Sequence, residues 1–270
     1  MYSPIELSTK FLRYYLTASN GKGHGVHSPF VFDFIRTVLN DKSAYDAYSK
    51  VEEQRKKLLH NHEWIIIRDY GAGKSGGTEH RKRVNEIASR SLKSPKYAKL
   101  LFRIARRYFP ETNSRPLFLE LGTSLGITTS YFALANPSAR VVSFEGASGI
   151  AAIARQNFSD LGTEKIRLVE GNFDETLPPF LETSSFIDLA FIDGNHSEDA
   201  TLRYFEMLLK KRKGNSVFIF DDVHWSQGME NAWQQILQHP AVTLSVDLFF
   251  IGIVFFNTDF KVKQDFRLRF

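Results

Sequence analysis

The sequence predicts an α/β fold: a doubly wound, mostly parallel sheet of seven strands with an antiparallel last strand, preceded by a mostly helical N-terminal region. After residue 113, short apolar runs rich in Val, Ile, Leu and Phe alternate with amphipathic stretches. Before residue 113, helical spacing dominates. Strands that are apolar on both faces and are joined by helices indicate a parallel sheet covered on both sides. We therefore expect a helical N-terminal cap over 1–113 and an α/β domain over 114–270.

Four segments of the N-terminal region have helical spacing. They are Ile5–Leu16, Phe30–Leu39, Val84–Ser91 and Tyr97–Phe109. The stretch Gly71–Gly77 (GAGKSGG) is expected to be a flexible loop, and it lacks the leading glycine of a phosphate-binding P-loop. Pro110 and Pro116 end the last helix and mark the domain boundary.

Seven strands are expected after the boundary. They are Leu117–Leu121, Val141–Phe144, Ile166–Val169, Ile187–Ile192, Val217–Phe220, Val242–Leu248 and Ile251–Phe256. The helices between them are Ile127–Ala135, Ile150–Leu161, Glu198–Leu209 and Gly228–Leu237, with an irregular segment at Leu177–Leu181. The last two strands must pair as a hairpin, because too few residues separate them for a helical crossover. This order is Rossmann-like, and we expect the C-terminal residues 266–270 to extend the sheet at an edge.

Composition limits the class of protein. The chain has 270 residues, and its 43% hydrophobic and 24% charged residues are typical of a globular protein. The absence of cysteine excludes disulfides, a thiolate nucleophile and cysteine-ligated metals. No apolar run approaches the ~20 residues of a membrane span. Glu6, Lys10 and Arg13 interrupt any hydrophobic region of a signal peptide at the N-terminus. We therefore expect a cytoplasmic protein that does not insert into a membrane.

Charge is unevenly distributed along the chain. Residues 1–113 carry 21 Lys and Arg against 11 Asp and Glu, a net charge of +10, whereas residues 114–270 carry 14 against 19, a net charge of −5. A basic extension of this kind is compatible with an ordinary solvated surface and also with an acidic partner.

The first predicted strand of the α/β domain leads into a glycine turn, Glu120-Leu-Gly-Thr-Ser-Leu-Gly126. Open parallel sheets bind ligands beyond the carboxyl ends of their strands. Gly122 and Gly126 permit a tight turn and a close approach to a ligand, and the next helix directs its N-terminal amides there. Glu120 would repel a pyrophosphate but suits an ammonium group. Ser124 stands where a dinucleotide fingerprint requires glycine, and an ordinary strand-to-helix connection remains the alternative.

Polar residues also follow the second and third strands. Glu145 is placed to accept hydrogen bonds from two vicinal ribose hydroxyls. Asn172 could pair with the edge of an adenine, and Phe173 could pack on its face. Alternatively, Glu145 is a solvated strand end and Asn172 a turn residue.

In this order, ELGTSLG, Glu145, GNF and FIDG, followed by a terminal strand hairpin, resemble the class I S-adenosylmethionine-dependent methyltransferases over roughly residues 116–256. The resemblance implies S-adenosylmethionine as cofactor. It further implies a cofactor site formed by Glu120, Gly122, Thr123, Ser124 and Gly126 at the methionine moiety, Glu145 at the ribose, Asn172 and Phe173 at the adenine, and Asp193 beside them. Many members of this family have glycine at the position of Ser124. The serine side chain narrows the loop.

The fourth and fifth strands end in FIDGNH (191–196) and FDDVHW (220–225). Adjacent strand ends lie side by side, so we expect Asp193, Asp221 and Asp222 to converge. Three carboxylates in one crevice repel each other unless a cation lies between them, and Mg²⁺ or another hard divalent cation would suit. Such an ion would lower the pKa of an acceptor hydroxyl.

These residues resemble the metal-dependent O-methyltransferases of the catechol and caffeoyl type. The resemblance implies Asp193, Asp221 and Asp222 as metal ligands, with Asp222 replacing the usual Asn. It places His196 where catechol-type enzymes have a lysine base. Histidine occurs there in a D-G-x-H branch that includes sugar O-methyltransferases, and its ordinary pKa suits a general base near neutrality.

Several residues have two interpretations. Asp221 and Asp222 could instead cap the following helix. His224 and Trp225 are interpreted as packing residues or walls of an acceptor pocket, with a role as ligands as the alternative. The loop with His24 and His27 is a solvated loop or a lid over the crevice.

The sequence thus predicts an enzyme that methylates a small-molecule hydroxyl with the help of a divalent metal. One alternative is a nucleic-acid methyltransferase that uses the basic extension, with its clusters Arg81–Arg83 and Arg106–Arg107. Another is a cofactor-binding module without turnover. A homodimer is left open, and the acceptor itself depends on cap and loop residues that sequence patterns do not define.

Overall fold

The computed structural model describes residues 1–68, 79–112 and 114–270. The chain forms two compact units, one of Lys42–Ser184 and one of Met1–Asp41 with Ser185–Phe270. The glycine stretch Gly71–Gly77 lies outside the described residues. The boundary between residues 113 and 114 stays a prediction.

In the unit of residues 42–184, the described residues form six helices and five strands. In chain order its elements are α3 (Asp46–Leu59), β1 (Trp64–Arg68), β2 (Glu79–Arg83), α4 (Val84–Ser91), α5 (Pro95–Tyr108), β3 (Leu117–Leu121), α6 (Ile127–Ala135), β4 (Arg140–Glu145), α7 (Ser148–Asp160), β5 (Arg167–Glu170) and α8 (Phe173–Thr183). β3, β4 and β5 are adjacent and parallel, with Glu120 opposite Ser143 and Glu145 opposite Glu170. All five residues of β3 are buried, which explains its uninterrupted apolar run apart from Glu120.

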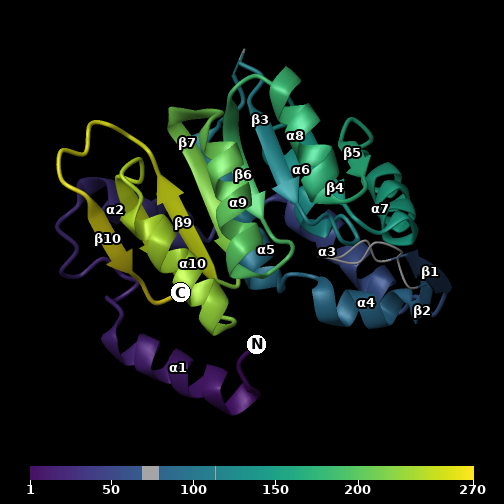
Figure 1. Ribbon diagram of the computed structural model, residues 1–270, viewed down its shortest axis with the longest axis horizontal. Coiled ribbons are helices and arrows are strands. Elements are labelled where there is room, and N and C mark those ends of the chain that lie inside the picture. Colours follow the sequence, from purple (N-terminus) through teal and green to yellow (C-terminus); the bar gives the residue numbers. More distant parts are fainter. Residues whose placement is uncertain (69–78, 113) are drawn as a thin grey trace. The chain divides into compact units, whose positions relative to one another are not determined.

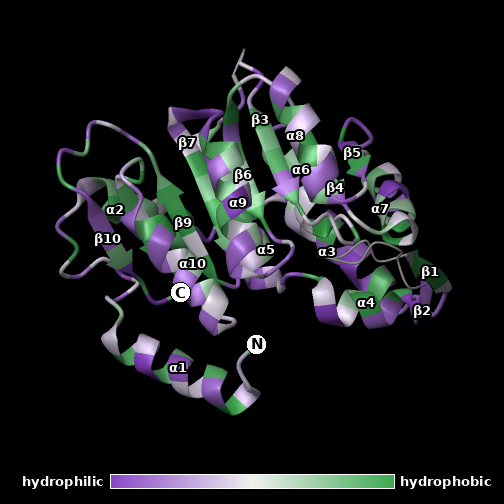
Figure 2. Ribbon diagram, in the orientation of Figure 1, coloured by the Kyte–Doolittle hydropathy of each residue, from purple (hydrophilic) through white to green (hydrophobic). Residues whose placement is uncertain are grey.

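The second unit combines the chain's two ends. Its elements are α1 (Pro4–Thr17), α2 (Pro29–Phe34), the π-helix η1 (Ile35–Leu39), β6 (Ile187–Ile192), α9 (Glu198–Leu209), β7 (Arg212–Asp221), α10 (Gln227–Gln238), β8 (Leu244–Asp247), β9 (Ile251–Phe255) and β10 (Gln264–Arg267). The strands lie in the order β10-β8-β9-β7-β6. β6 and β7 are parallel, whereas β9 is antiparallel to both β7 and β8 (Figure 1). These strands are apolar throughout their centres, as Figure 2 shows for β6, β7 and β9.

The predicted fold class is confirmed. The seven expected strands are found as β3 to β9. Within one unit β3, β4 and β5 are parallel, and within the other β6 and β7 are parallel and β9 is antiparallel to β7. β10 adds a parallel edge strand beside β8, in agreement with the expected C-terminal extension.

Three details differ from the prediction. The segment expected to be irregular around Leu177–Leu181 is part of the regular helix α8, which contains Pro178 and Pro179. These prolines leave two carbonyls, of residues 174 and 175, without intrahelical donors, but both residues are exposed to water. The helix α3 and the antiparallel hairpin of β1 and β2 were not expected. The apolar run of β1 is too short for periodicity to distinguish strand from helix.

Candidate functional site

The glycine turn after β3 adopts a left-handed backbone at three positions. φ is 101° at Gly122, 48° at Ser124 and 79° at Gly126, which caps the N-terminus of α6. A Cβ on Gly126 would lie 2.5 Å from the ring of Phe158 in α7, so only glycine fits without displacing that ring. Ser124 bears the cost of a left-handed conformation that glycine would avoid.

Hydrogen bonds hold this turn from three directions. The backbone N–H of Ser124 donates to Oε2 of Glu145 (2.8 Å). The side-chain amide of Asn157 donates to the carbonyl of Leu125 (2.7 Å). The hydroxyls of Ser124 and Ser91 are 2.8 Å apart, so the last residue of α4 contacts the turn. The position of the glycine turn is therefore determined by elements far away in the sequence.

Glu120 is completely buried in β3. Its Oε2 accepts hydrogen bonds from the hydroxyls of Thr129 and Ser143, the latter at 2.6 Å. Ser143 is in turn 2.5 Å from the hydroxyl of Thr123 in the turn. Burial raises the pKa of Glu120 to about 7, although these hydroxyl bonds and a neighbouring one oppose the shift. Its other oxygen, Oε1, has no hydrogen-bond partner within the described part of the chain.

Glu145 and Asn172 lie at neighbouring strand ends. Oε1 of Glu145 accepts a bond from the backbone N–H of Ala147 (2.9 Å), so both carboxylate oxygens face backbone amides. The carbonyl of Glu145 accepts from Gly171 (3.0 Å), which connects the second and third strand ends. Asn172 caps α8 by accepting from the N–H of Asp174 (2.9 Å). Phe173 begins that helix and is partly exposed.

The second group of expected residues lies in the other unit, at the ends of β6 and β7. One side-chain ligand atom from each of Asp193, His196 and Asp221 lies within 4.8 Å of the other two. Nε2 of His196 is 3.6 Å from Oδ1 of Asp193. Asp221 is buried, Asp193 is partly buried and His196 is exposed. Two carboxylates and an imidazole at this spacing form a donor set for a divalent cation.

Asp222 is not a member of this group of three. It has φ of 53° and begins a turn, in which its N–H donates to the carbonyl of Phe250 (2.7 Å). The alternative that this acidic pair caps α10 is wrong, because Ser226 is the N-cap and accepts from the N–H of Met229 (3.2 Å).

His224 faces two carboxylates rather than the group of three. Its Nδ1 is 3.1 Å from Glu230 and its Nε2 is 2.9 Å from Asp247, and its ring stacks on Phe249. Burial lowers the pKa of His224, but its bonds to Asp247 and Glu230 outweigh burial and raise it. His224 is therefore a packed, ion-paired residue, as one of its two interpretations proposed.

His24 and His27 are exposed, in a loop whose Gly23 approaches the ring of Phe32. Neither histidine is found in a metal-binding group within the described ranges. Trp225 is partly buried, and its carbonyl accepts from the N–H of Tyr2 (3.1 Å).

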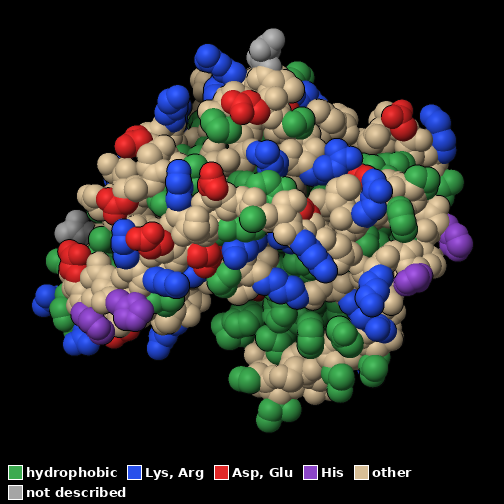
Figure 3. Space-filling view, turned by 180° about the vertical axis from the view of Figure 1, so that it is seen from behind, with side chains coloured by type: hydrophobic (Ala, Val, Ile, Leu, Met, Phe, Trp, Pro, Cys, Tyr) green, Lys and Arg blue, Asp and Glu red, His purple; other side chains and the backbone are tan. Residues whose placement is uncertain are grey.

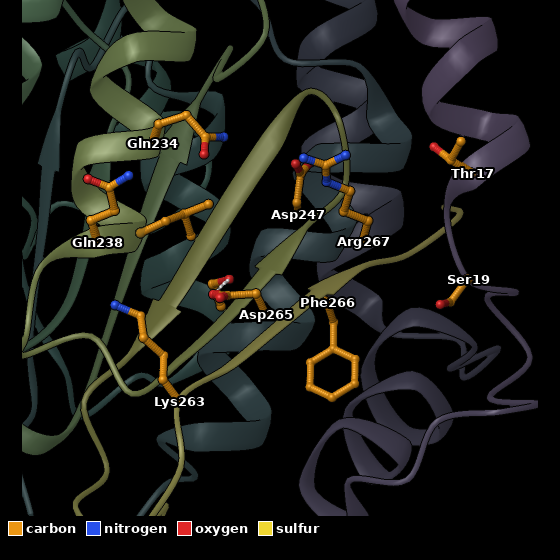
Figure 4. Close-up of a pocket in the computed structure, with 11 residues that line it drawn as sticks. Thr17, Ser19, Gln234, Gln238, Asp247, Lys263, Asp265, Phe266 and Arg267 are labelled. Carbon is orange, nitrogen blue, oxygen red and sulfur yellow. Dashed lines mark hydrogen bonds between the residues drawn. The ribbon is translucent and has the colours of Figure 1, made fainter.

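A cavity of about 640 Å³ lies in the same unit as His224, between α10 and the strands β8 and β10 (Figure 4). Its charged lining residues are Lys263, Arg267, Asp265 and Asp247. Two cations and two carboxylates give it no net preference for either sign of charge. It includes no site residue expected from the sequence.

Four residues of the candidate site were missed: Thr129, Ser143 and Asn157, which hydrogen-bond to Glu120 or to the glycine turn, and Ser91, which contacts the turn. A polar residue in an otherwise apolar strand, such as Ser143 in RVVSFE, was the available signal. The others lie on helices, where sequence alone does not say which neighbour they face.

Comparison with known proteins gives one family match and several structural ones. Residues 119–223 match a family model described as a methyltransferase domain. No curated protein matches the sequence. No helix within residues 1–68, 79–112 and 114–270 combines the length and apolarity needed to cross a membrane.

Three solved structures illustrate the likeness of fold. The O-methyltransferase TomG from Streptomyces achromogenes, in complex with S-adenosylmethionine, is 18% identical with a TM-score of 0.54, over 80% of this chain and 91% of that one. The methyltransferase PaMTH1 of Podospora anserina, bound to S-adenosylhomocysteine, is 14% identical with a TM-score of 0.57, over 85% and 97%. An O-methyltransferase from Bacillus cereus, in complex with S-adenosylhomocysteine, is 20% identical with a TM-score of 0.51, over 84% and 97%.

Proposed function

We propose that this chain transfers a methyl group from S-adenosylmethionine to a hydroxyl of a small molecule. Residues 119–223 match a methyltransferase-domain model, and the fold is similar to those of solved methyltransferases bound to S-adenosylmethionine or S-adenosylhomocysteine. The observation that carries the choice of a hydroxyl is the group of Asp193, His196 and Asp221, whose ligand atoms lie within 4.8 Å of one another. Two of the similar solved structures are O-methyltransferases.

The buried carboxylate of Glu120 supports a cofactor with an ammonium group. An unpaired oxygen in a buried carboxylate is costly unless it is protonated or meets a cation. The methionine ammonium of S-adenosylmethionine would supply that cation, with Gly122, Thr123, Ser124 and Gly126 of the turn around it. A carboxylate offers about four acceptor positions, so the two backbone bonds of Glu145 are compatible with ribose hydroxyls. Asn172 and Phe173 would face the adenine.

In the proposed reaction, the hydroxyl oxygen of the acceptor forms a bond to the methyl carbon. The bond between that carbon and sulfur breaks, and its electron pair remains on sulfur, which yields S-adenosylhomocysteine. The hydroxyl proton passes to an imidazole nitrogen of His196, whose Nε2 lies 3.6 Å from Oδ1 of Asp193. Asp193 orients that imidazole and stabilises its protonated form.

A divalent cation fits the same residues. When bound, it would lower the pKa of the acceptor hydroxyl. Asp193 and Asp221 supply the oxygen ligands that Mg²⁺ prefers, and this choice leaves His196 available as a base. If His196 is itself a ligand, an ion with more affinity for imidazole, such as Zn²⁺, is favoured, and the base must be another group.

Calorimetric titration with S-adenosylhomocysteine, with and without Mg²⁺, tests the cofactor first. We expect micromolar binding, and Glu145→Ala should weaken it by about 1–3 kcal/mol through loss of charge-assisted bonds. Unchanged affinity in this variant would remove the ribose assignment, and no binding by the wild type would refute the cofactor proposal.

Asp221→Asn tests the metal. We expect it to abolish stimulation by Mg²⁺ in a methylation assay on a panel of hydroxylated small molecules, while S-adenosylhomocysteine still binds. Asp199→Asn, at an exposed acid of α9, is the matched control and should behave as the wild type. Full wild-type activity in the presence of a chelator would contradict metal assistance.

Methylation of nucleic acid is the second candidate, and the hairpin of β1 and β2 favours it. Trp64 is 49% exposed, and the guanidinium groups of Arg83 and Arg81 lie 4.8 and 5.8 Å from its ring. Exposed aromatic rings flanked by Arg are typical of single-strand binding surfaces.

Titration with single-stranded RNA at rising salt separates these candidates. A steep loss of affinity with salt, abolished by Trp64→Ala, would favour nucleic acid. Cofactor binding without methylation of any acceptor, across metals and both acceptor classes, would instead indicate a cofactor-binding module.

A further inference from the structure

Helix α1 has apolar side chains on two opposite faces. On its inner face, Leu7, Phe11 and Tyr14 pack against Phe249 and Phe250, and the rings of Phe11 and Phe249 are 5.1 Å apart. The buried hydroxyl of Tyr14 donates to the carbonyls of Asp247 and Leu268, at 2.6 and 2.8 Å. This face is sufficient to dock the helix on its own unit.

The outer face is apolar as well. Ile5, Leu12 and Leu16 are 80%, 59% and 69% exposed. Positions separated by 7 and 11 residues fall on one side of an α-helix, so these three side chains form one stripe. Figure 3 shows hydrophobic side chains gathered over α1, and Figure 2 shows the alternation of apolar and polar residues along it. A helix that is apolar on two opposite sides is suited to burial between two surfaces, of which its own unit supplies one.

The helix cannot turn to bury this stripe. Lys10 forms an ion pair with Glu230 in α10 (2.9 Å), next to the inner face that Tyr14 anchors. A capping box between Ser3 and Glu6 fixes the first turn. The stripe therefore stays unburied by the unit to which α1 belongs.

The charges beside the stripe identify its partner. Glu6 and Arg13 are seven residues apart, on the same flank of the stripe, and both are exposed. If two copies of α1 pack antiparallel about a two-fold axis, Glu6 of each copy faces Arg13 of the other, while the two stripes meet. We propose that this face of α1 binds a second copy of the chain as a symmetric dimer.

The same charges argue against a membrane as the partner. Helices that lie on anionic membranes carry an excess of Lys and Arg on the polar side. Here one acid balances one exposed base, and the remaining lysine, Lys10, is paired with Glu230.

Pairing would also stabilise the segment after Asp221. The N–H of Tyr2 donates to the carbonyl of Trp225 (3.1 Å), and its hydroxyl donates to Glu230 (2.8 Å). Fixing α1 from outside therefore protects residues 222–226, which hydrogen exchange can report independently of activity.

Sedimentation velocity of the full-length chain tests the dimer. We expect twice the chain mass of 31.0 kDa for the wild type and a shift to 31.0 kDa for Leu12→Glu, with faster amide exchange at residues 222–226. Leu59→Glu places the same charge on an exposed leucine of α3 and should remain dimeric. Circular dichroism melts confirm that each variant is folded.

Charge exchange tests the arrangement. Arg13→Glu should weaken self-association by about tenfold, because attractive contacts become repulsive. Glu6→Lys, which also removes the carboxylate of the capping box, should weaken it at least as much, and mixing the two variants should restore the dimer. Two results would overturn the proposal: a wild-type monomer, including one that co-sediments with phosphatidylglycerol vesicles, or a Leu12→Glu variant that remains dimeric. Failure of the mixture to associate would overturn the antiparallel arrangement.

Discussion

Replacement of Glu120 by glutamine is expected to stabilise the folded protein at neutral and alkaline pH. Burial raises the pKa of this carboxyl from 4.5 to about 7. The folded protein therefore holds the proton over a range in which the unfolded chain releases it. The resulting stabilisation is complete below pH 4.5 and is lost as the pH rises through about 7.

The size of this effect follows from the shift. Each pKa unit corresponds to about 1.4 kcal/mol, so ionisation of Glu120 costs the folded state about 3 kcal/mol above neutrality. Glutamine has a similar shape and no charge, and it requires only that one hydroxyl neighbour, Ser143 or Thr129, reorient to accept its amide. We expect a net gain of about 2 kcal/mol after that adjustment.

Urea unfolding at about pH 5 and about pH 8 measures the difference. The free energy of unfolding of Glu120→Gln should exceed that of the wild type at the higher pH and approach it at the lower. The same replacement at Glu182, exposed in α8, is the control and should have no such pH dependence. If the difference between Glu120→Gln and wild type is equal at both pH values, the carboxyl does not titrate in this range and the reasoning is refuted. The gain in stability should accompany weaker binding of S-adenosylhomocysteine, by about tenfold, because the ammonium loses its charged partner.

Two further predictions concern the glycine turn and the buried histidine. Gly126→Ala should lower the free energy of unfolding by about 2–4 kcal/mol, because it combines a left-handed backbone with a clash against Phe158. Gly162 is also left-handed but has open space around it, so Gly162→Ala should lower the free energy of unfolding by only about 1–2 kcal/mol in the same urea titration. Equal losses in the two variants would contradict the predicted clash. Burial lowers the pKa of His224, but two carboxylates outweigh burial and raise it above 6.5. The free energy of unfolding of the wild type should therefore fall as the pH rises from about 6.5 upward, and His224→Gln should lack this fall. Parallel pH profiles of the two proteins would contradict this prediction.

Part of this molecule is determined by local sequence pattern. Apolar runs such as Ile187–Ile192 and amphipathic stretches such as Glu198–Leu209 became the expected strand and helix with the expected bounds, because burial on both faces or on one face leaves a distinct period. The order of these elements specifies a parallel sheet, and a parallel sheet places the residue after each strand at one edge. For this reason Glu145 and Asp193 could be identified as strand-end residues from sequence alone.

Partners across the fold could not be predicted in this way. Nothing in ELGTSLG indicates that Glu120 is completely buried, or that Ser143 and Thr129 take one of its oxygens. The hairpin beginning at Trp64 escaped prediction because its run is short and its partner strand is polar. These features depend on contacts between residues distant in sequence.

Which of the polar residues at the ends of β6 and β7 lie together also depends on tertiary structure. The sequence supplied four candidates, Asp193, His196, Asp221 and Asp222. The fold brought Asp193, His196 and Asp221 together, whereas Asp222 lies in a turn. Consecutive residues at a strand end point in different directions, so spacing alone could not say which aspartate joins. The sequence by itself therefore determined the fold class and the strand ends that carry the candidate site residues. Tertiary structure decided the burial and the partners of each group, because those depend on side-chain direction and on neighbours that the chain order does not specify.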